Sequence, residues 1–110
     1  MPTTYKVLGQ SAPSATTNTN LYSVPAATNA VISTIVVANR VGTTATYRIA
    51  IRPVGATLAN QHYIAYDVTV GGADSTTLTL GITLAATDVI TIYASTANLS
   101  FSVFGSEITS

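Results

Sequence analysis

The side chains that could do acid–base chemistry are few, and they do not cluster. His62 is the only histidine, and a histidine that acts as a general base or holds a metal normally has a carboxylate or a second histidine beside it. Asp67 is five positions away, so on a strand the two side chains point to opposite faces. We therefore expect His62 to be structural or to lie at a surface contact.

The carboxylates are scattered over separate parts of the chain, at Asp67, Asp74, Asp88 and Glu107. A catalytic pair of the glycosidase type needs two carboxyl groups within roughly 5–10 Å, and no spacing here indicates such a pair. Asp74 and Asp88 begin predicted turns, the ordinary position for aspartate, and a calcium site around Asp74 is an alternative. The chain has no cysteine, which excludes disulfides, thiolate zinc sites and cysteine nucleophiles.

Phosphate-binding and hydrolase motifs are also missing from the sequence. The pair Gly71 and Gly72 is not followed by the helix that a phosphate-binding loop requires. No serine stands in a nucleophile-elbow pattern. The sequence therefore predicts a protein that is not an enzyme, with no catalytic residue, no metal ligand and no cofactor.

The arginines offer a different kind of site, one for binding. Arg40, Arg48 and Arg52 fall within thirteen positions, and on a strand Arg48 and Arg52 share a face about 13 Å apart. They are either solvated charges, with a pairing to Asp67, or contacts between subunits, because arginine is enriched at interfaces. We predict Arg40, Arg48, Arg52 and Tyr63 as interface residues.

Tyrosines could add a sugar-binding face, since Tyr47, Tyr63, Tyr66 and Tyr93 carry rings that stack on sugars. Tyrosines of the core or of an interface, with the hydroxyl reaching a polar partner, are the more common case. Carbohydrate recognition is therefore the lesser of the two interpretations.

The low charge of the chain bounds its partners. Only 7% of the residues are charged and the formal net charge is zero, against about 25% charged residues in an average soluble domain. Repulsion between copies is weak, so we expect a homo-oligomer, either a dimer or a trimer. Nucleic-acid binding needs a clustered positive face, and a membrane span needs roughly 20 apolar residues in a row; neither is indicated.

The elements that must position these residues are strands. Val, Ile, Thr and Tyr recur with a period of two, and no segment has a helical stripe. Turn residues separate about eight expected strands, the third of them central, at residues 5–8, 21–24, 30–38, 44–52, 61–70, 75–82, 89–94 and 99–104. This spacing predicts an all-β fold, an antiparallel two-sheet β-sandwich or jelly roll. We expect one domain over residues 1–110, with residues 9–20 as a flexible loop or an N-terminal arm.

Several runs of the sequence resemble small virion structural proteins of tailed bacteriophages, most of all those of cyanophages. These runs are LYSVPA at 21–26, VISTIVVAN at 31–39, YRIAIR at 47–52, LAATDVITIYA at 84–94 and FGSEI at 104–108. Many such proteins have glycine where this chain has Thr87. The resemblance covers most of the chain and implies a particle component that is present in many copies.

What the resemblance implies about function is a capsid cement or decoration protein. Its partner would be the major capsid protein or other virion proteins, and binding across assembled subunits would stabilise the shell by mass action. The alternative is a tail, neck, baseplate or fibre-attachment module, with or without glycan binding. The first residues lack the apolar core of a signal peptide, so we expect synthesis in the host cytoplasm and residence in the virion.

Overall fold

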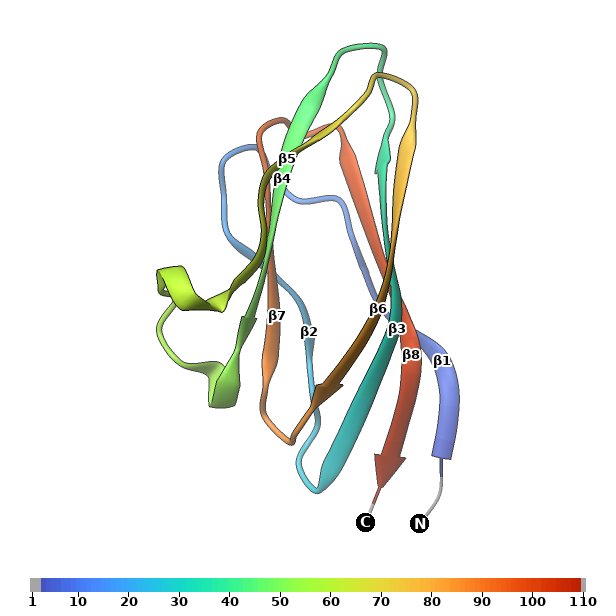
Figure 1. Ribbon diagram of the computed structural model, residues 1–110, viewed down its shortest axis with the longest axis vertical. Helices are drawn as coiled ribbons and strands as arrows, with labels where there is room; N and C mark the ends of the chain where they lie inside the picture. The colour runs from blue at the N-terminus through green and yellow to red at the C-terminus, as the bar shows by residue number, and fades with distance from the viewer. Residues whose placement is uncertain (1–2, 110) are drawn as a thin grey trace.

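The computed structural model describes residues 3–109, apart from the side chain of Leu80, and its regular elements are strands except for two short 3-10 helices. Two four-stranded antiparallel sheets face each other (Figure 1), which confirms the predicted all-β sandwich. Two 3-10 helices, Pro53–Gly55 and Asn60–His62, lie in the β4–β5 connection, which projects from the side of the sandwich (Figure 1). The strands are β1 (Thr3–Ser11), β2 (Thr19–Ser23), β3 (Thr28–Asn39), β4 (Ala45–Arg52), β5 (Tyr63–Val70), β6 (Ser75–Leu84), β7 (Val89–Ala94) and β8 (Leu99–Thr109).

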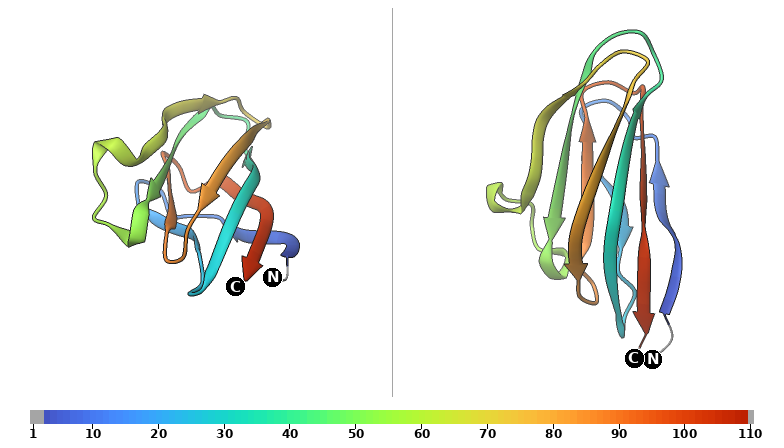
Figure 2. Two further views of the ribbon diagram at one scale, coloured as in Figure 1. Left: turned by 60° about the horizontal axis from the view of Figure 1, so that its bottom comes forward. Right: turned by 45° about the vertical axis from the view of Figure 1, so that its right-hand side comes forward.

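The order of the strands is that of an eight-stranded jelly roll. Sheet A has the order β1-β8-β3-β6 and sheet B the order β2-β7-β4-β5, so most connections cross from one sheet to the other (Figure 2). This is the double Greek-key arrangement of that fold. The expectation that the third strand is central is confirmed, because β3 lies between β8 and β6.

The core fills the space between the sheets with apolar side chains taken from alternate positions. In β3, Ile32, Ile35 and Val37 are fully buried, whereas their neighbours along the strand face outward. At the centre the rings of Tyr47 and Phe101 meet edge to face, with centroids 6.2 Å apart, a favoured aromatic geometry. Burial raises the pKa of Tyr47. Close packing of the two inner faces thus holds the sandwich together without a disulfide.

Each of the four edge strands carries a β-bulge, where either one residue has no counterpart on the neighbouring strand or two residues stand opposite one. The bulges lie at Leu8 in β1, at Leu21 in β2, at residues 80–81 in β6, and at Ile64 and at residues 66–67 in β5. A bulge bends its strand and shifts the alternation of side chains. The sense in which side chains point therefore changes along these edges.

The bulges correct one expectation about the fifth strand. Strict alternation over residues 61–70 places His62, Ile64, Tyr66, Val68 and Val70 on one face of the strand. Ile64 and Tyr66 are instead 47% and 56% exposed, because the two bulges displace them from the regular pleat. His62 and Val70, at the two ends of the stretch, are buried, so the five residues do not share one environment.

Strands β1 and β2 both extend into the stretch that the sequence indicated as a loop. Residues 9–11 pair with β8, and residues 19–20 pair with β7, so the connection expected over residues 9–20 is confined to residues 12–18. The backbone N–H of Thr16 donates to the carbonyl of Ala94 (2.8 Å), which fastens this loop to sheet B. It is a loop between strands and not an N-terminal arm.

A polar link joins the two sheets near the end where β1 begins. The hydroxyl of Tyr22, in sheet B, donates to a carboxylate oxygen of Glu107, in sheet A (2.5 Å), and Lys6 pairs with the other oxygen (2.9 Å). These bonds from Tyr22 and Lys6 lower the pKa of Glu107. Burial, followed by the hydrogen bond to Glu107, raises the pKa of Tyr22. The ionised carboxylate and the neutral phenol are therefore the pair that the fold stabilises.

We predict that Glu107→Gln lowers the free energy of unfolding at pH 7 by about 1–2 kcal/mol, since a charge-assisted hydrogen bond is lost. Because the pKa of Glu107 is lowered in the fold, its stabilisation is present above the usual glutamate pKa of about 4.3 and disappears as the pH falls below it. Urea unfolding at pH 7 and at acidic pH measures both effects, and the variant should lose less stability on acidification than the parent.

The matched control for this link is Lys6→Gln. The side chain of Lys6 is 47% exposed, so its ion pair is worth only about 0–1 kcal/mol. Equal losses for Lys6→Gln and Glu107→Gln at pH 7 would contradict the role given to the Tyr22 bond.

Candidate functional site

The outer face of sheet B brings together two of the predicted interface residues, Arg48 and Tyr63. Arg48 pairs across the strands with Tyr93, and its guanidinium lies over two rings, 4.2 Å from the centroid of Tyr66 and 4.3 Å from that of Tyr93. Tyr63 meets Tyr66 edge to face at 4.9 Å. The result is one cluster of aromatic rings around a cation.

Asp67 completes this cluster through the second bulge of β5. Its carboxylate accepts a hydrogen bond from Nε of Arg48 at 2.6 Å, so the predicted pairing of Arg48 with Asp67 is confirmed. The bond to Asp67 raises the pKa of Arg48. Asp67 has a left-handed backbone (φ 52°), and Tyr66 and Asp67 together stand opposite Arg48 in the strand pairing. The bulge thus aims both side chains at the arginine.

The members of this cluster contact one another. Arg48 contacts one face of Tyr66 and one face of Tyr93, and a sugar would need such faces for stacking. Tyr47, the fourth tyrosine proposed for a sugar face, is fully buried in the core. Arg48 therefore packs against these tyrosines as part of the fold, and the arrangement does not favour carbohydrate binding by them.

The other predicted interface residues lie apart from the cluster. Arg52 pairs with Val89 at the far end of β4, so it shares the outer face with Arg48 as expected. Arg40 lies after β3, and its guanidinium donates to the carbonyl of Ala97 (2.7 Å). The arginines that are close in sequence do not form a single patch.

The candidate acid–base residues serve the local backbone. Nδ1 of His62 accepts a hydrogen bond from the N–H of Ala59 (3.0 Å), which gives His62 the expected structural place. Asp88 accepts from the N–H groups of Val54 and Ala85 (both 2.9 Å). The carboxylate of Asp74 accepts from the N–H of Ser75 (2.8 Å). Within residues 3–109 no three potential metal ligands of the His, Cys, Asp or Glu type come together.

The outer face of sheet A is different, because it carries no charge. The strand pairing places only Thr, Ser, Asn, Gln, Ala, Gly and apolar residues at its outward positions. The charged residues of these four strands are Lys6 and Glu107, and they pair with each other. Both charged residues of sheet A therefore belong to the polar link with Tyr22.

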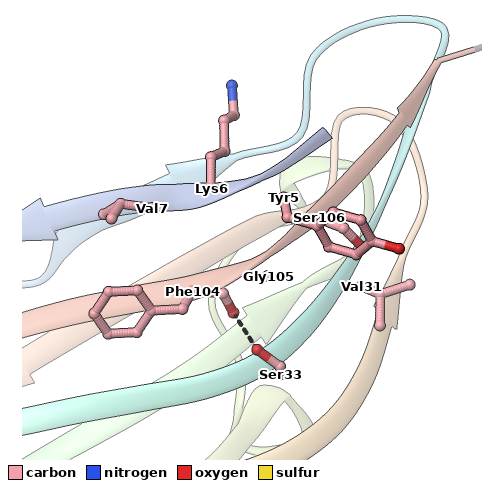
Figure 3. Close-up of a pocket in the computed structure, with 8 residues that line it drawn as sticks. All are labelled: Tyr5, Lys6, Val7, Val31, Ser33, Phe104, Gly105 and Ser106. Atoms are coloured by element: carbon pink, nitrogen blue, oxygen red, sulfur yellow. Dashed lines mark hydrogen bonds between the residues drawn. The ribbon is translucent and has the colours of Figure 1, made fainter. Parts of the chain in front are cut away.

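An apolar groove of about 540 Å³ crosses this neutral face (Figure 3). Tyr5, Val7, Val31 and Phe104 supply its apolar walls, and Tyr5, Val7 and Val31 are 82%, 48% and 36% exposed. Val7 stands directly opposite Phe104 in the pairing of β1 with β8. Lys6 also lines the groove, but its side chain points away from these rings (Figure 3). Large apolar groups exposed side by side are typical of a contact surface.

Backbone packing brings the strands of the groove close together. Val31 pairs with Ser106, and at Gly105 a Cβ atom would come within 2.1 Å of the carbonyl oxygen of Val31. Only glycine fits there. Ser33 forms a bulge in β3 beside it and donates to the carbonyl of Phe104 (3.1 Å).

Sequence reasoning missed the groove. The alternation of Tyr5 and Val7 in an expected strand was a usable sign of an apolar face. Nothing in the sequence paired those residues with Phe104 or Val31, because the registers depend on the bulges at Leu8 and Ser33.

We predict that Arg48→Glu lowers the melting temperature by several degrees. The change removes two cation–ring contacts and sets a negative charge beside Asp67. Arg52→Glu, four residues along the same face, is the control and should lower the melting temperature less. Thermal unfolding followed by circular dichroism measures both, and equal shifts would argue against the Arg48 cluster as a stabilising unit.

Comparison with known proteins identifies no family for this chain. No protein-family model matches the sequence, and no curated protein is significantly similar to it. In the part of the chain that the structure describes, no helix is long and apolar enough to cross a membrane. The neutral outer face of sheet A, with its apolar groove, is the surface best suited to a partner.

Proposed function

We propose that this protein is a structural component of a tailed-phage virion, and specifically a capsid cement or decoration protein that binds across capsid subunits. The observation that supports the proposal is the neutral outer face of sheet A with its groove of Tyr5, Val7, Val31 and Phe104. The resemblance of the sequence to small phage virion proteins supports the location. The partner is the major capsid protein or another virion protein.

A neutral face suits this task for an energetic reason. Charged side chains cost free energy when an interface removes them from water, whereas hydroxyl groups exchange water for protein partners at little cost. Apolar area covered on docking contributes roughly 25 cal/mol per Å². A face of Ser and Thr around a few large apolar residues therefore gains from being covered over most of its surface.

The proposed mechanism is stabilisation by mass action. A cap that binds the assembled shell and not the loose subunits shifts the assembly equilibrium toward the shell. Contacts made by many copies add up over the particle, even if each is weak. The protein acts by covering joints, and its charged residues support its own fold.

We predict that Val31→Lys weakens binding to shells stripped of this protein by at least about tenfold, since an apolar contact is lost and a charge enters the interface. Co-sedimentation of the purified protein with stripped shells measures the effect. Ile64→Lys is the matched control, because Ile64 is a similarly exposed apolar residue on sheet B, away from the groove. It should bind as the parent does.

Two outcomes would overturn the cement proposal. One is unchanged shell binding by Val31→Lys. The other is a copy number of about a dozen or fewer per purified particle by gel densitometry, since a protein that covers the joints of a whole shell is present in many copies. A low copy number together with binding to isolated tails would favour the tail, neck, baseplate or fibre-attachment alternative.

A further inference from the structure

The four edge strands of the sandwich differ in how well they are protected against pairing with another chain. Natural sheets protect their edges with short strands, bulges and charged residues, above all inward-pointing ones. Here β2 has only five residues and a bulge. β5 has two bulges and the charged Asp67. β1 has a bulge and carries Lys6, which turns toward Glu107.

Strand β6 is the exception. Its ten residues, Ser75–Leu84, contain no charged residue and no proline. Its bulge lies in the second half, so Ser75, Thr76, Thr77, Leu78 and Thr79 pair with β3 without interruption. Ser75, Thr77 and Thr79 are exposed. A regular, neutral and exposed stretch of edge is thus left open on sheet A.

The hydrogen bond at the start of this stretch shows which residues of β6 direct their backbone groups toward β3 and which direct them toward the open edge. The N–H of Asn39 donates to the carbonyl of Asp74 (2.8 Å), so residue 74 belongs to the pairs that bond to β3. In an antiparallel ladder these pairs alternate. The N–H and C=O groups of Thr77 and Thr79 therefore point away from β3, toward the open edge. Backbone groups of this kind are templates for an added strand.

We propose that two copies of this protein pair through β6, antiparallel about a two-fold axis at Thr77, so that the two A sheets become one continuous sheet. The N–H groups of Thr77 and Thr79 donate to carbonyls of the partner copy's β6. The inference rests on the edge geometry and not on shell binding, and it adds to the proposed function a defined contact between copies.

The sequence of β6 is complementary to itself in this register. With Thr77 on the axis, Thr77 stands opposite its own counterpart and Ser75 opposite Thr79, which gives hydroxyl pairs on the outer face. On the inner side Thr76 stands opposite Leu78. Asp74, the nearest charge, lies three residues from the axis, so the two copies of Asp74 are roughly 20 Å apart and do not repel strongly.

The inner side of the edge also gains from pairing. Leu78 packs against the core but remains partly exposed at the margin of sheet A. A neighbouring strand would cover it, and the area covered adds an apolar contribution to the backbone bonds. One short strand makes a smaller contact than a standard interface, so we expect a dissociation constant of about 1–100 μM.

Sedimentation equilibrium of the purified chain tests the pairing directly. We expect the parent to form a dimer of twice the 11.3 kDa chain mass. Thr77→Pro removes an outward N–H that the ladder with β3 does not use, so the fold should persist while dimerisation weakens at least about tenfold. Ser100→Lys, on the same outer face but on the central strand β8, is the control and should dimerise as the parent does.

Cross-linking determines the register. Because the chain has no cysteine, an introduced cysteine is the only thiol that can react. Thr77→Cys should react to a covalent dimer with a short bismaleimide, because the paired Cα atoms are about 5.5 Å apart. Thr83→Cys, on the same strand and face, should not, since its counterpart lies roughly 40 Å away. This comparison decides the matter even if Thr77→Pro does not fold.

Three results would overturn the pairing: a monomeric parent at millimolar concentration, a folded Thr77→Pro variant that dimerises normally, or equal cross-linking at positions 77 and 83. Shell binding is a separate readout, since Thr77→Pro leaves Val31 and the groove unchanged. A dimer that does not bind shells would count against the cement proposal alone.

Discussion

The alternation of side chains along β3 is the constraint on which the rest of the fold depends. Every inward position from Ala30 to Val37 is filled by a fully buried apolar residue, so a slip of one residue would bring that set to the surface. β8 and β6 pair with β3 on either side, and their inner faces are matched to it. The Ser33 bulge is the one interruption. It sets the register of β8 against β3, so that Val31 pairs with Ser106 on one side of the bulge and Thr34 with Phe104 on the other, and Val31 and Phe104 become walls of the groove.

A second constraint concerns charge. All four carboxylates accept hydrogen bonds within the chain, Glu107 from Tyr22, Asp67 from Arg48, and Asp74 and Asp88 from backbone N–H groups. Lys6 and Arg40 are also engaged internally. The few charged side chains therefore stabilise strand edges, turns and the link between the two sheets. The neutrality that the composition revealed is concentrated on one face, the outer side of sheet A.

The positions of the strands could be predicted from the sequence far better than the way in which the strands pair and pack. The alternation of β7 is regular and its predicted bounds, 89–94, match the structure. β1 and β8 were expected to be shorter, because Gly9 and Gly105 look like residues that end strands. Both are glycines for another reason, since a Cβ atom would come within 2.3 Å and 2.1 Å of the Leu21 and Val31 carbonyl oxygens. The pairing of Arg48 with Asp67 was predictable because few partners exist, but the bulge that aims Asp67 was not.

The uncharged outer face of sheet A has a consequence for the medium in which the protein can work. Salt screens contacts between charges, with a Debye length of about 8 Å at physiological ionic strength and less in brine. A contact made by hydroxyl and apolar groups has little to screen, and excluded salts even strengthen apolar burial. A contact made through this face would therefore not weaken as the ionic strength rises, in contrast to one that depends on ion pairs.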